Sequence, residues 1–373
     1  MSRFSGQIIV ILVISLSVII QTAQENPPVP ASELPLLRDD FHLGTTFYGS
    51  ADIPDDDRLS AQIQDASAAG MNGFAYYVDW ADLEAQPGTY TLNDFENTLA
   101  WLAEMNIQPL VNITLIDIES LQLHPDLPDE VLLDDPLIVD RLTRLLDEVV
   151  PLLLQYDGFV LLLGNEVDGY FATVPEEQLA AYARLINAAR QHIHMISQEL
   201  AVGVTLTGGE VFEQRAVFQA LRPVTDTIPF NYYGLQTTLD DNWLSLIDFD
   251  EIPGIIARYV EIYDDTPIII QELGCPASDL NESSLELQAA CFEAFFEVIR
   301  AYPQIRYVAV FTMFDWDKTL CDIVVELLSS GEDDALPELY INRQRGFLCN
   351  IGLLNADYTA KPAWDIFIQA LSG

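Results

Sequence analysis

Two glutamates stand where carboxylates can cooperate in chemistry, because each follows a run of apolar residues. Glu166 ends the segment 159–166, and Glu272 ends the segment 267–272. Runs that are apolar on both faces are typical of the buried parallel strands of an α/β fold. A carboxylate just past such a strand lies at the mouth of a sheet or barrel, where α/β enzymes bind ligands. Two carboxylates there are the minimum equipment for cleaving a glycosidic bond.

The chain around these glutamates alternates between strand-like and helical patterns. Strands are predicted at residues 44–48, 73–80, 108–114, 159–165, 201–207, 228–235, 267–272 and 307–314. Helices are predicted at residues 58–69, 92–105, 136–155, 175–199, 211–221, 253–263, 284–302 and 361–371. Eight βα units over about 330 residues indicate a single α/β domain, the (β/α)8 TIM barrel. The alternative is a doubly wound open sheet. Its nucleotide-binding forms are disfavoured, because the sequence has no Gly-x-Gly-x-x-Gly after the first strand and no Walker-type loop.

A long loop is predicted after the last strand, from Asp315 to about Pro362. It contains the acidic stretch 331–334, Gly-Glu-Asp-Asp. Long loops at the strand ends of a barrel usually shape a site. The alternative is a surface insertion held by a disulfide.

In a barrel, Glu166 and Glu272 follow strands four and seven, on opposite sides of the mouth. Their side chains can therefore converge on one bound sugar. At a separation of about 5–5.5 Å, one carboxylate attacks the anomeric carbon while the other protonates the leaving oxygen. For either glutamate alone, a salt bridge or a helix cap is the more frequent explanation.

Four segments in order resemble the retaining glycoside hydrolases of the large clan that shares the (β/α)8 barrel, often called clan A. The segments are Gly164-Asn165-Glu166-Val167, Glu272-Leu273-Gly274-Cys275-Pro276-Ala277, residues 80–90 (Trp-Ala-Asp-Leu-Glu, then Pro-Gly-Thr-Tyr) and residues 352–364. The first two most resemble plant-type β-1,3-glucanases and endo-β-1,4-galactanases. Two departures stand out: Cys275 replaces the aromatic residue of the glucanases, and no histidine falls at a strand end of the expected site.

This resemblance, which covers roughly residues 43–370, implies a role for each site residue. Glu166 is implied as the catalytic acid/base and Glu272 as the nucleophile. Asn165 is implied as the hydrogen-bond partner of the sugar 2-hydroxyl.

The sixth strand carries two further candidates. Period-two alternation places Asn231 and Tyr233 on one face of it, so both are expected in the substrate site. The resemblance makes Tyr233 the residue that hydrogen-bonds the nucleophile. Tyr232 is the fallback, and a plain core tyrosine is the alternative.

Aromatic residues near the strand ends are candidate sugar platforms, because the C–H face of a pyranose packs on a ring. Trp316 is preferred, and Trp80 is the second choice. Two other residues could line outer subsites or merely cover hydrophobic surface: Tyr170 and Trp243.

The formal net charge of −42, from 58 acidic and 16 basic residues, indicates which partners the protein takes. Such a surface repels nucleic acid, anionic lipid and acidic polysaccharide, so a neutral substrate is the expected partner, here a carbohydrate. A salty habitat or simple solubility is the alternative explanation of the charge. No cofactor and no metal is expected. His192 and His194 face apart on a helix, and the run 55–57 lacks the spaced ligands of a calcium loop.

The N-terminus predicts export. Arg3 precedes an apolar run at 8–20, which matches a signal peptide over residues 1–23 and is short for a membrane span. A Pro-rich linker is predicted at 24–40 and the catalytic barrel at 41–373. We expect a secreted or extracytoplasmic monomer whose mature domain does not insert into a membrane. An uncleaved N-terminal anchor is the alternative.

The four cysteines fit an exported protein. Local pairing favours Cys275–Cys291 and Cys321–Cys349, with buried free thiols as the alternative. Of the two glycosylation sequons, at Asn112 and Asn281, at most the second is credible, and only in a eukaryotic host, because the first lies in a predicted strand.

Taken together, the sequence predicts a secreted retaining β-glycoside hydrolase that acts on a neutral poly- or oligosaccharide. Two alternatives remain. One is a carbohydrate-binding barrel without turnover, and the other is a transglycosylase that uses the same two glutamates.

Overall fold

The computed structural model describes residues 41–46, 57–127, 131–236, 244–264, 266–329 and 338–372. Its centre is one sheet of parallel strands in the order β10-β11-β12-β13-β1-β2-β5-β8-β9. The strands are β1 (His42–Thr46), β2 (Gly73–Val78), β5 (Gln108–Ile113), β8 (Val160–Leu162), β9 (Ala201–Gly203), β10 (Leu206–Thr207), β11 (Phe230–Tyr233), β12 (Ile268–Gly274) and β13 (Ile305–Val310).

The sheet closes on itself, because its two ends belong to one stretch of chain. Strands β9 and β10 are successive parts of the run 201–207. On one side of this run, the Leu163 amide donates to the Gly203 carbonyl at 3.0 Å. On the other side, the Leu206 amide donates to the Pro229 carbonyl, also at 3.0 Å. The run is therefore one barrel strand between β8 and β11, and the predicted (β/α)8 barrel is confirmed.

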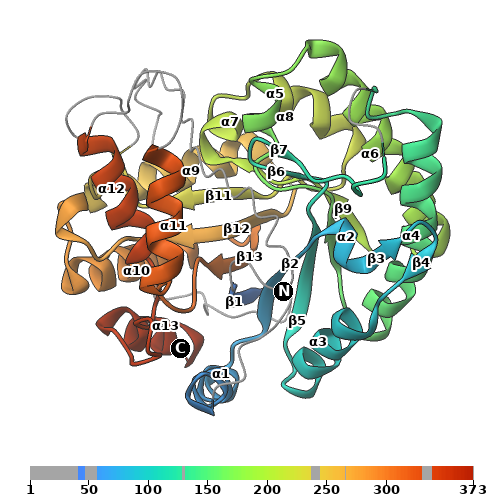
Figure 1. Ribbon diagram of the computed structural model, residues 1–373. Helices are drawn as coiled ribbons and strands as arrows, with labels where there is room; N and C mark the ends of the chain where they lie inside the picture. The colour runs from blue at the N-terminus through green and yellow to red at the C-terminus, as the bar shows by residue number, and fades with distance from the viewer. Residues whose placement is uncertain are drawn as a thin grey trace.

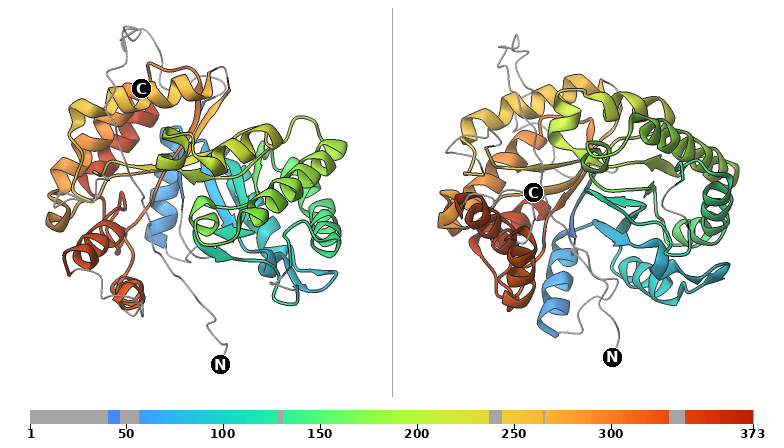
Figure 2. Two further views of the ribbon diagram at one scale, coloured as in Figure 1. Left: turned by 90° about the horizontal axis from the view of Figure 1, so that it is seen from above. Right: turned by 45° about the horizontal axis from the view of Figure 1, so that its top comes forward.

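A ring of helices surrounds the strands (Figures 1 and 2). It consists of α1 (Asp57–Ala69), α3 (Asn93–Glu104), α4 (Pro136–Gln155), α6 (Glu176–Ile196), α7 (Gly208–Phe212), α8 (Ala216–Leu221), α9 (Ile252–Tyr263), α10 (Leu285–Ile299) and α13 (Pro362–Ser372). Side-chain caps start several of them. Asp135 accepts from the Leu137 amide at 2.9 Å before α4, and Ser284 accepts from the Leu287 amide at 3.2 Å before α10. Helix α13 packs against both α10 and α1, which completes the ring.

One predicted helix is divided in the structure. The segment predicted as 211–221 forms α7 and α8, with a break at Gln214, which adopts a left-handed φ of 51°. The carboxylate of Glu210 accepts from the amides of Val217 at 2.8 Å and Phe218 at 3.1 Å. This carboxylate satisfies the free amides at the start of α8, which stabilises the second helix as a separate element.

The prediction of a loop from Asp315 to Pro362 was wrong, because this segment contains two helices, α11 (Lys318–Ser329) and α12 (Glu338–Cys349). Helix α12 carries no clear apolar stripe, since Arg343, Gln344 and Gly346 are among its buried residues. The acidic stretch 331–334 lies outside the described residues. Both expected disulfides are present, Cys275–Cys291 and Cys321–Cys349.

Short elements gather at the carboxyl ends of the strands. They are α2 (Trp80–Leu83), α5 (Asp168–Phe171), the hairpin β3 (Glu84–Gln86) with β4 (Thr89–Tyr90), the hairpin β6 (Ile116–Asp117) with β7 (Ser120–Leu121), and the 3₁₀ turns η3 (Phe249–Glu251) and η4 (Asp279–Asn281). A further 3₁₀ turn, η2 (Arg222–Val224), follows α8 and precedes β11.

The barrel interior is divided into two layers. An apolar cluster fills one part of it, with Ala75, Leu110, Val160, Leu162, Ile269, Tyr307 and Ala309. Nearer the carboxyl ends of the barrel strands, buried side chains are polar: Asn112, Thr205, Asn231, Gln271 and Glu272. Buried polar groups need hydrogen-bond partners, so this second layer is where a site can be built.

The two sequons do not offer glycosylation sites. Both Asn112 and Asn281 have fully buried side chains. The Asn281 amide donates to the carbonyls of Leu244 at 2.8 Å and Arg343 at 2.9 Å, so the expectation for this sequon was wrong.

The predicted signal peptide, 1–23, and linker, 24–40, lie outside the described residues. Within the described part, no helix is long and apolar enough to cross a membrane.

Candidate active site

Glu166 is placed by a tight turn after β8. Gly164 has a φ of +138°, and Glu166 itself has a left-handed φ of +44°. A Cβ atom on Gly164 would lie 2.7 Å from the Tyr182 hydroxyl, so only glycine fits. Asn112 holds the turn from the neighbouring strand, because its amide exchanges two 3.2 Å hydrogen bonds with the backbone of Gly164. The Glu166 side chain is thereby turned inward, and the residue is only 4% exposed.

Glu272 lies on β12 where the pairing of this strand is irregular. The register against β13 shifts between Ile270 and Leu273. Gln271 and Glu272, although consecutive, both contact the same inward-facing hydroxyl of Tyr77. An irregularity of this kind re-aims side chains, and here it brings two polar groups to one place in the barrel.

Two tyrosines donate to the carboxylate of Glu272. The Tyr77 hydroxyl lies 2.5 Å from one oxygen. The Tyr233 hydroxyl donates to the other oxygen, which is the contact that the resemblance implied. Tyr232, the fallback, points elsewhere and packs against the rings of Tyr259 and Phe295.

Tyr77 was missed by the sequence reasoning. Its signal lies in the alternation of β2, where Gly73, Ala75 and Tyr77 occupy every second position. Ala75 belongs to the apolar cluster inside the barrel, and Tyr77 packs against that cluster. Period-two alternation could therefore have placed the Tyr77 side chain inside the barrel, near the carboxyl end of β2.

Asn231 lies beside Glu272 in the pairing of β11 with β12 and reaches the turn that carries Glu166. Its amide donates to a carboxylate oxygen of Glu166 at 2.9 Å and to the side-chain oxygen of Asn165 at 3.3 Å. Asn165 in turn donates to Asp117 at 3.1 Å. Glu166, Asn165 and Asn231 are thus brought together, all nearly fully buried.

Gln271 joins this group to Tyr77 and fixes the direction of the Tyr77 hydrogen bond. Its oxygen accepts from Thr205 at 2.5 Å and from Asn112 at 3.3 Å. Its nitrogen donates to the Tyr77 hydroxyl at 2.6 Å and to Asn165 at 2.9 Å. Since Tyr77 accepts from Gln271, its single proton is free to donate to Glu272.

The two carboxyl groups differ in their proton affinity. Burial raises the pKa of Glu272 to about 7, while hydrogen bonds from Tyr233 and Tyr77 oppose that rise. Burial also raises the pKa of Glu166 well above its ordinary value, and the negative charges of Glu272 and Asp168 raise it further. The hydrogen bonds from the two tyrosines favour the ionised form of Glu272, whereas burial and neighbouring negative charge favour the protonated form of Glu166.

Other acidic groups lie beside the pair. Burial raises the pKa of Asp117 to about 6, opposed by the hydrogen bond from Asn165. Asp168 accepts from the amide and the hydroxyl of Thr207, at 2.9 and 2.6 Å. In the described part of the chain, no group of three or more His, Cys, Asp or Glu side chains is arranged to hold a metal ion.

The aromatic candidates fall into different places. Trp80 is fully buried, and its indole N–H donates to Glu84 at 2.7 Å, so the structure does not bring its ring to the mouth. Trp316 is 6% exposed and belongs to a small apolar cluster against which Tyr233 packs. Tyr170 is half-buried and packs against the main core, and Trp243 lies outside the described residues.

Comparison with known proteins agrees with the fold. No family model and no curated protein matches the sequence. Among solved structures, a GH5_18 protein from Bifidobacterium longum subsp. longum, crystallised as a variant with Manβ1-4GlcNAc, is 14% identical with a TM-score of 0.67, over 89% of this chain and 78% of that one. A GH5_18 protein from Streptomyces cattleya, also with Manβ1-4GlcNAc, is 13% identical with a TM-score of 0.64, over 89% and 80%.

An exo-β-1,4-mannosidase from Opitutaceae bacterium strain TAV5 is 14% identical with a TM-score of 0.60. This match covers 89% of this chain and 59% of that one. At such identities, the similarity establishes a shared barrel fold.

Removing either tyrosine hydroxyl should raise the pKa of Glu272. Both hydroxyls donate to the ionised form, so Tyr77→Phe and Tyr233→Phe each favour the protonated form, by roughly one pKa unit. The measurement is a carbon-13 NMR titration of side-chain-labelled glutamates, with Glu272 assigned by its loss in Glu272→Gln. Tyr232→Phe is the matched control and should leave the titration unchanged. An equal shift in all three variants would refute the assignment of donors.

Glu166→Gln should stabilise the fold at alkaline pH. The folded-state pKa of Glu166 is raised, so ionisation above the unfolded pKa costs stability, and that cost grows up to the folded pKa. Glutamine removes the cost and keeps an acceptor for Asn231. The unfolding temperature should therefore rise by a few degrees at pH 8 and change little at pH 4, as followed by calorimetry. A lower unfolding temperature at pH 8 would contradict the raised pKa.

Proposed function

We propose that this protein is a retaining β-glycoside hydrolase that acts on neutral oligo- or polysaccharides. The observation that carries the proposal is the unequal pair of buried glutamates. Glu272 receives two phenolic hydrogen bonds, while Glu166 accepts an amide hydrogen bond from Asn231 and has a pKa raised by burial and by neighbouring negative charge. A nucleophile that ionises beside an acid that stays protonated is what double displacement needs.

In this mechanism, the Glu272 carboxylate attacks the anomeric carbon while Glu166 protonates the departing oxygen. Glu166 then acts as a base on water, which releases the sugar from Glu272. Asn165 is proposed to bind the sugar 2-hydroxyl. Its amide is fixed by Gln271, Asn231 and Asp117, so it needs no reorganisation when the sugar binds.

The neutral substrate is proposed from charge. Asp117 and Asp168 contribute negative charge next to the two glutamates, in a protein of net charge −42. An anionic sugar would be repelled from such a mouth. The similar structures include an exo-β-1,4-mannosidase and proteins with Manβ1-4GlcNAc bound, which agrees with a β-linked substrate. Motif similarity to β-1,3-glucanases and endo-β-1,4-galactanases remains a prediction.

Action outside the cytoplasm is part of the proposal. Two disulfides support it, because such bonds persist in oxidising compartments. The monomeric state remains a prediction from the sequence.

The direct test is a panel of β-mannans, β-1,3-glucans, β-1,4-galactans and aryl β-glycosides assayed for released reducing ends. Glu272→Gln is the blank, because it removes the nucleophile at constant size. Activity in the wild type that is lost in this variant supports the proposal. Sugar transfer to an added acceptor, in preference to water, would favour the transglycosylase. No turnover on any aryl β-glycoside would favour a binding barrel.

Loss of the acid should depend on the leaving group. Glu166→Ala should cost roughly 10²–10⁴-fold in kcat/KM on substrates with poor leaving groups and much less on activated aryl glycosides. Added azide should restore the rate and give a β-glycosyl azide, because alanine opens room for a small anion on that face. The check is steady-state kinetics with product NMR. Equal losses on both substrate types without rescue would contradict the role of Glu166.

A further inference from the structure

The ring of Tyr233 lies between the active site and a separate apolar cluster. This second cluster consists of Leu235, Leu244, Phe311, Trp316, Cys321, Phe347, Leu348 and Ile351. The Phe347 ring meets the Tyr233 ring edge-on, with centroids 4.9 Å apart and planes at 79°. Phe311 meets it in the same way at 6.1 Å. Phe347 is fully buried and comes from α12, the helix that the sequence pattern did not predict.

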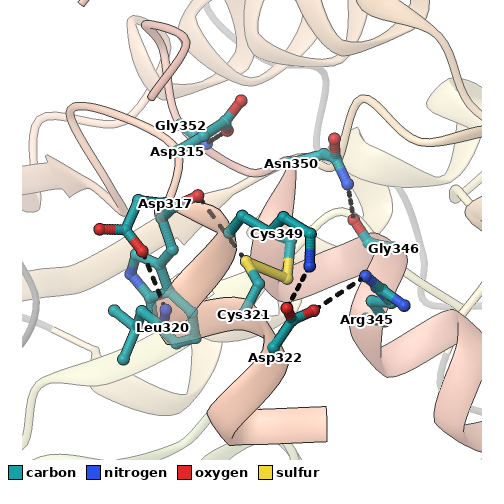
Figure 3. The surroundings of a disulfide bond; sticks show 12 residues. Asp315, Asp317, Leu320, Cys321, Asp322, Arg345, Gly346, Cys349, Asn350 and Gly352 are labelled. Carbon is teal, nitrogen blue, oxygen red and sulfur yellow. Dashed lines mark hydrogen bonds and ion pairs between the residues drawn. A yellow bond between two sulfur atoms is a disulfide. The ribbon is translucent and has the colours of Figure 1, made fainter. Parts of the chain in front are cut away.

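Helix α12 is fixed at the end that carries Phe347. Cys349, two residues later, forms the disulfide with Cys321 in the first turn of α11 (Figure 3). Asp322 next to this disulfide pairs with Arg345 at 3.2 Å, which adds a second link between the two helices (Figure 3). Helices α11 and α12, together called the α11–α12 unit, are therefore linked through Arg345 before Phe347 and Cys349 after it.

The same helix is also seated on the turn after β12. A Cβ atom on Gly346 would lie 2.4 Å from the side-chain oxygen of Asn281, so the backbone of α12 approaches η4 closely. Asn281 donates to the carbonyl of Arg343, and the Arg343 side chain pairs with Glu282 at 2.7 Å. These contacts leave the helix little freedom to move away from Tyr233.

We propose that Phe347, held by the α11–α12 unit and its disulfide, is a positioning residue that aims the Tyr233 hydroxyl at Glu272. The inference rests on the proposed function where it treats Glu272 as the nucleophile. A hydrogen bond from a hydroxyl weakens steeply when its direction changes. The edge-on contact limits the tilt of the Tyr233 ring, so the hydroxyl stays directed at the carboxylate. Phe347 contacts no reacting atom and acts through Tyr233.

The test compares Phe347→Leu with Phe367→Leu. Phe367 on α13 is equally buried, but it packs against Trp364 and Phe296. The readout is the pKa of Glu272 from carbon-13 NMR titration of labelled glutamates. Phe347→Leu should raise this pKa by roughly 0.5–1 unit, because a misaimed hydroxyl no longer favours the carboxylate. Phe367→Leu should destabilise the fold to a similar degree and leave the pKa unchanged.

A double-variant cycle separates positioning from general loosening. In the Tyr233→Phe background, Phe347→Leu should cause no further rise of the Glu272 pKa, because its effect passes through the missing hydroxyl. The variant Cys321→Ser/Cys349→Ser should shift the pKa in the same direction as Phe347→Leu. If Phe347→Leu does not fold, Phe347→Met retains more of the side-chain volume and is titrated in its place.

Two outcomes would overturn the inference: an unchanged pKa in folded Phe347→Leu, or a shift that adds fully to that of Tyr233→Phe. The titration needs no substrate, so it stands apart from the proposed function. If the wild type hydrolyses glycosides but Phe347→Leu leaves the Glu272 pKa unchanged, only the positioning role of Phe347 is refuted. If the wild type hydrolyses no glycoside but Phe347→Leu shifts the Glu272 pKa as expected, only the hydrolase proposal is refuted.

Discussion

Burying two carboxylates near one another inside a barrel is the constraint on which the rest of the site depends. Each charge loses its hydration, and each repels the other, so both pKa values rise. Only hydrogen-bond donors can keep one of the pair ionised near neutral pH, and no described Lys, Arg or His pairs with Glu166 or Glu272. Tyr77 and Tyr233 supply that stabilisation at Glu272, whereas Glu166 receives a single amide from Asn231. In the proposed mechanism, this inequality makes Glu272 the nucleophile and Glu166 the acid.

The barrel makes the inequality possible because its interior is shared by all of its strands. The side-chain oxygen of Gln271 accepts from Asn112 on β5 and from Thr205 between β9 and β10. Its nitrogen donates to Tyr77 on β2 and to Asn165 in the turn after β8. One saturated amide thus links four parts of the barrel around the two glutamates. The local distortions, at Gly164 and at the irregular pairing of β12, are what turn Glu166 and Glu272 into this layer. Because the side chain of Gln271 uses both its acceptor and its donor capacity, it holds these neighbours rigidly in place.

Much of this arrangement could be predicted from local signals. The apolar runs gave the eight barrel strands, and the position of each glutamate after its run placed it at the mouth. Tyr77 depends on a contact across 195 residues of chain, which only barrel closure creates. Trp80 was expected at the mouth, but Glu84, four residues later, accepts its indole N–H and holds it in the core. Helix α12 has no apolar periodicity, so its position follows from tertiary contacts and a disulfide across 28 residues.

The central claim is that Glu272 is the nucleophile of a double displacement. An activated 2-deoxy-2-fluoro β-glycoside slows the release of the glycosyl-enzyme, so the ester can be found by peptide mass spectrometry after proteolysis. The sugar is matched to the best substrate of the panel, and Glu166→Ala serves as a control that retains the nucleophile. The account predicts a single label of one sugar mass on Glu272. A label on Glu166 or on another carboxylate, with Glu272 unmodified, would contradict it.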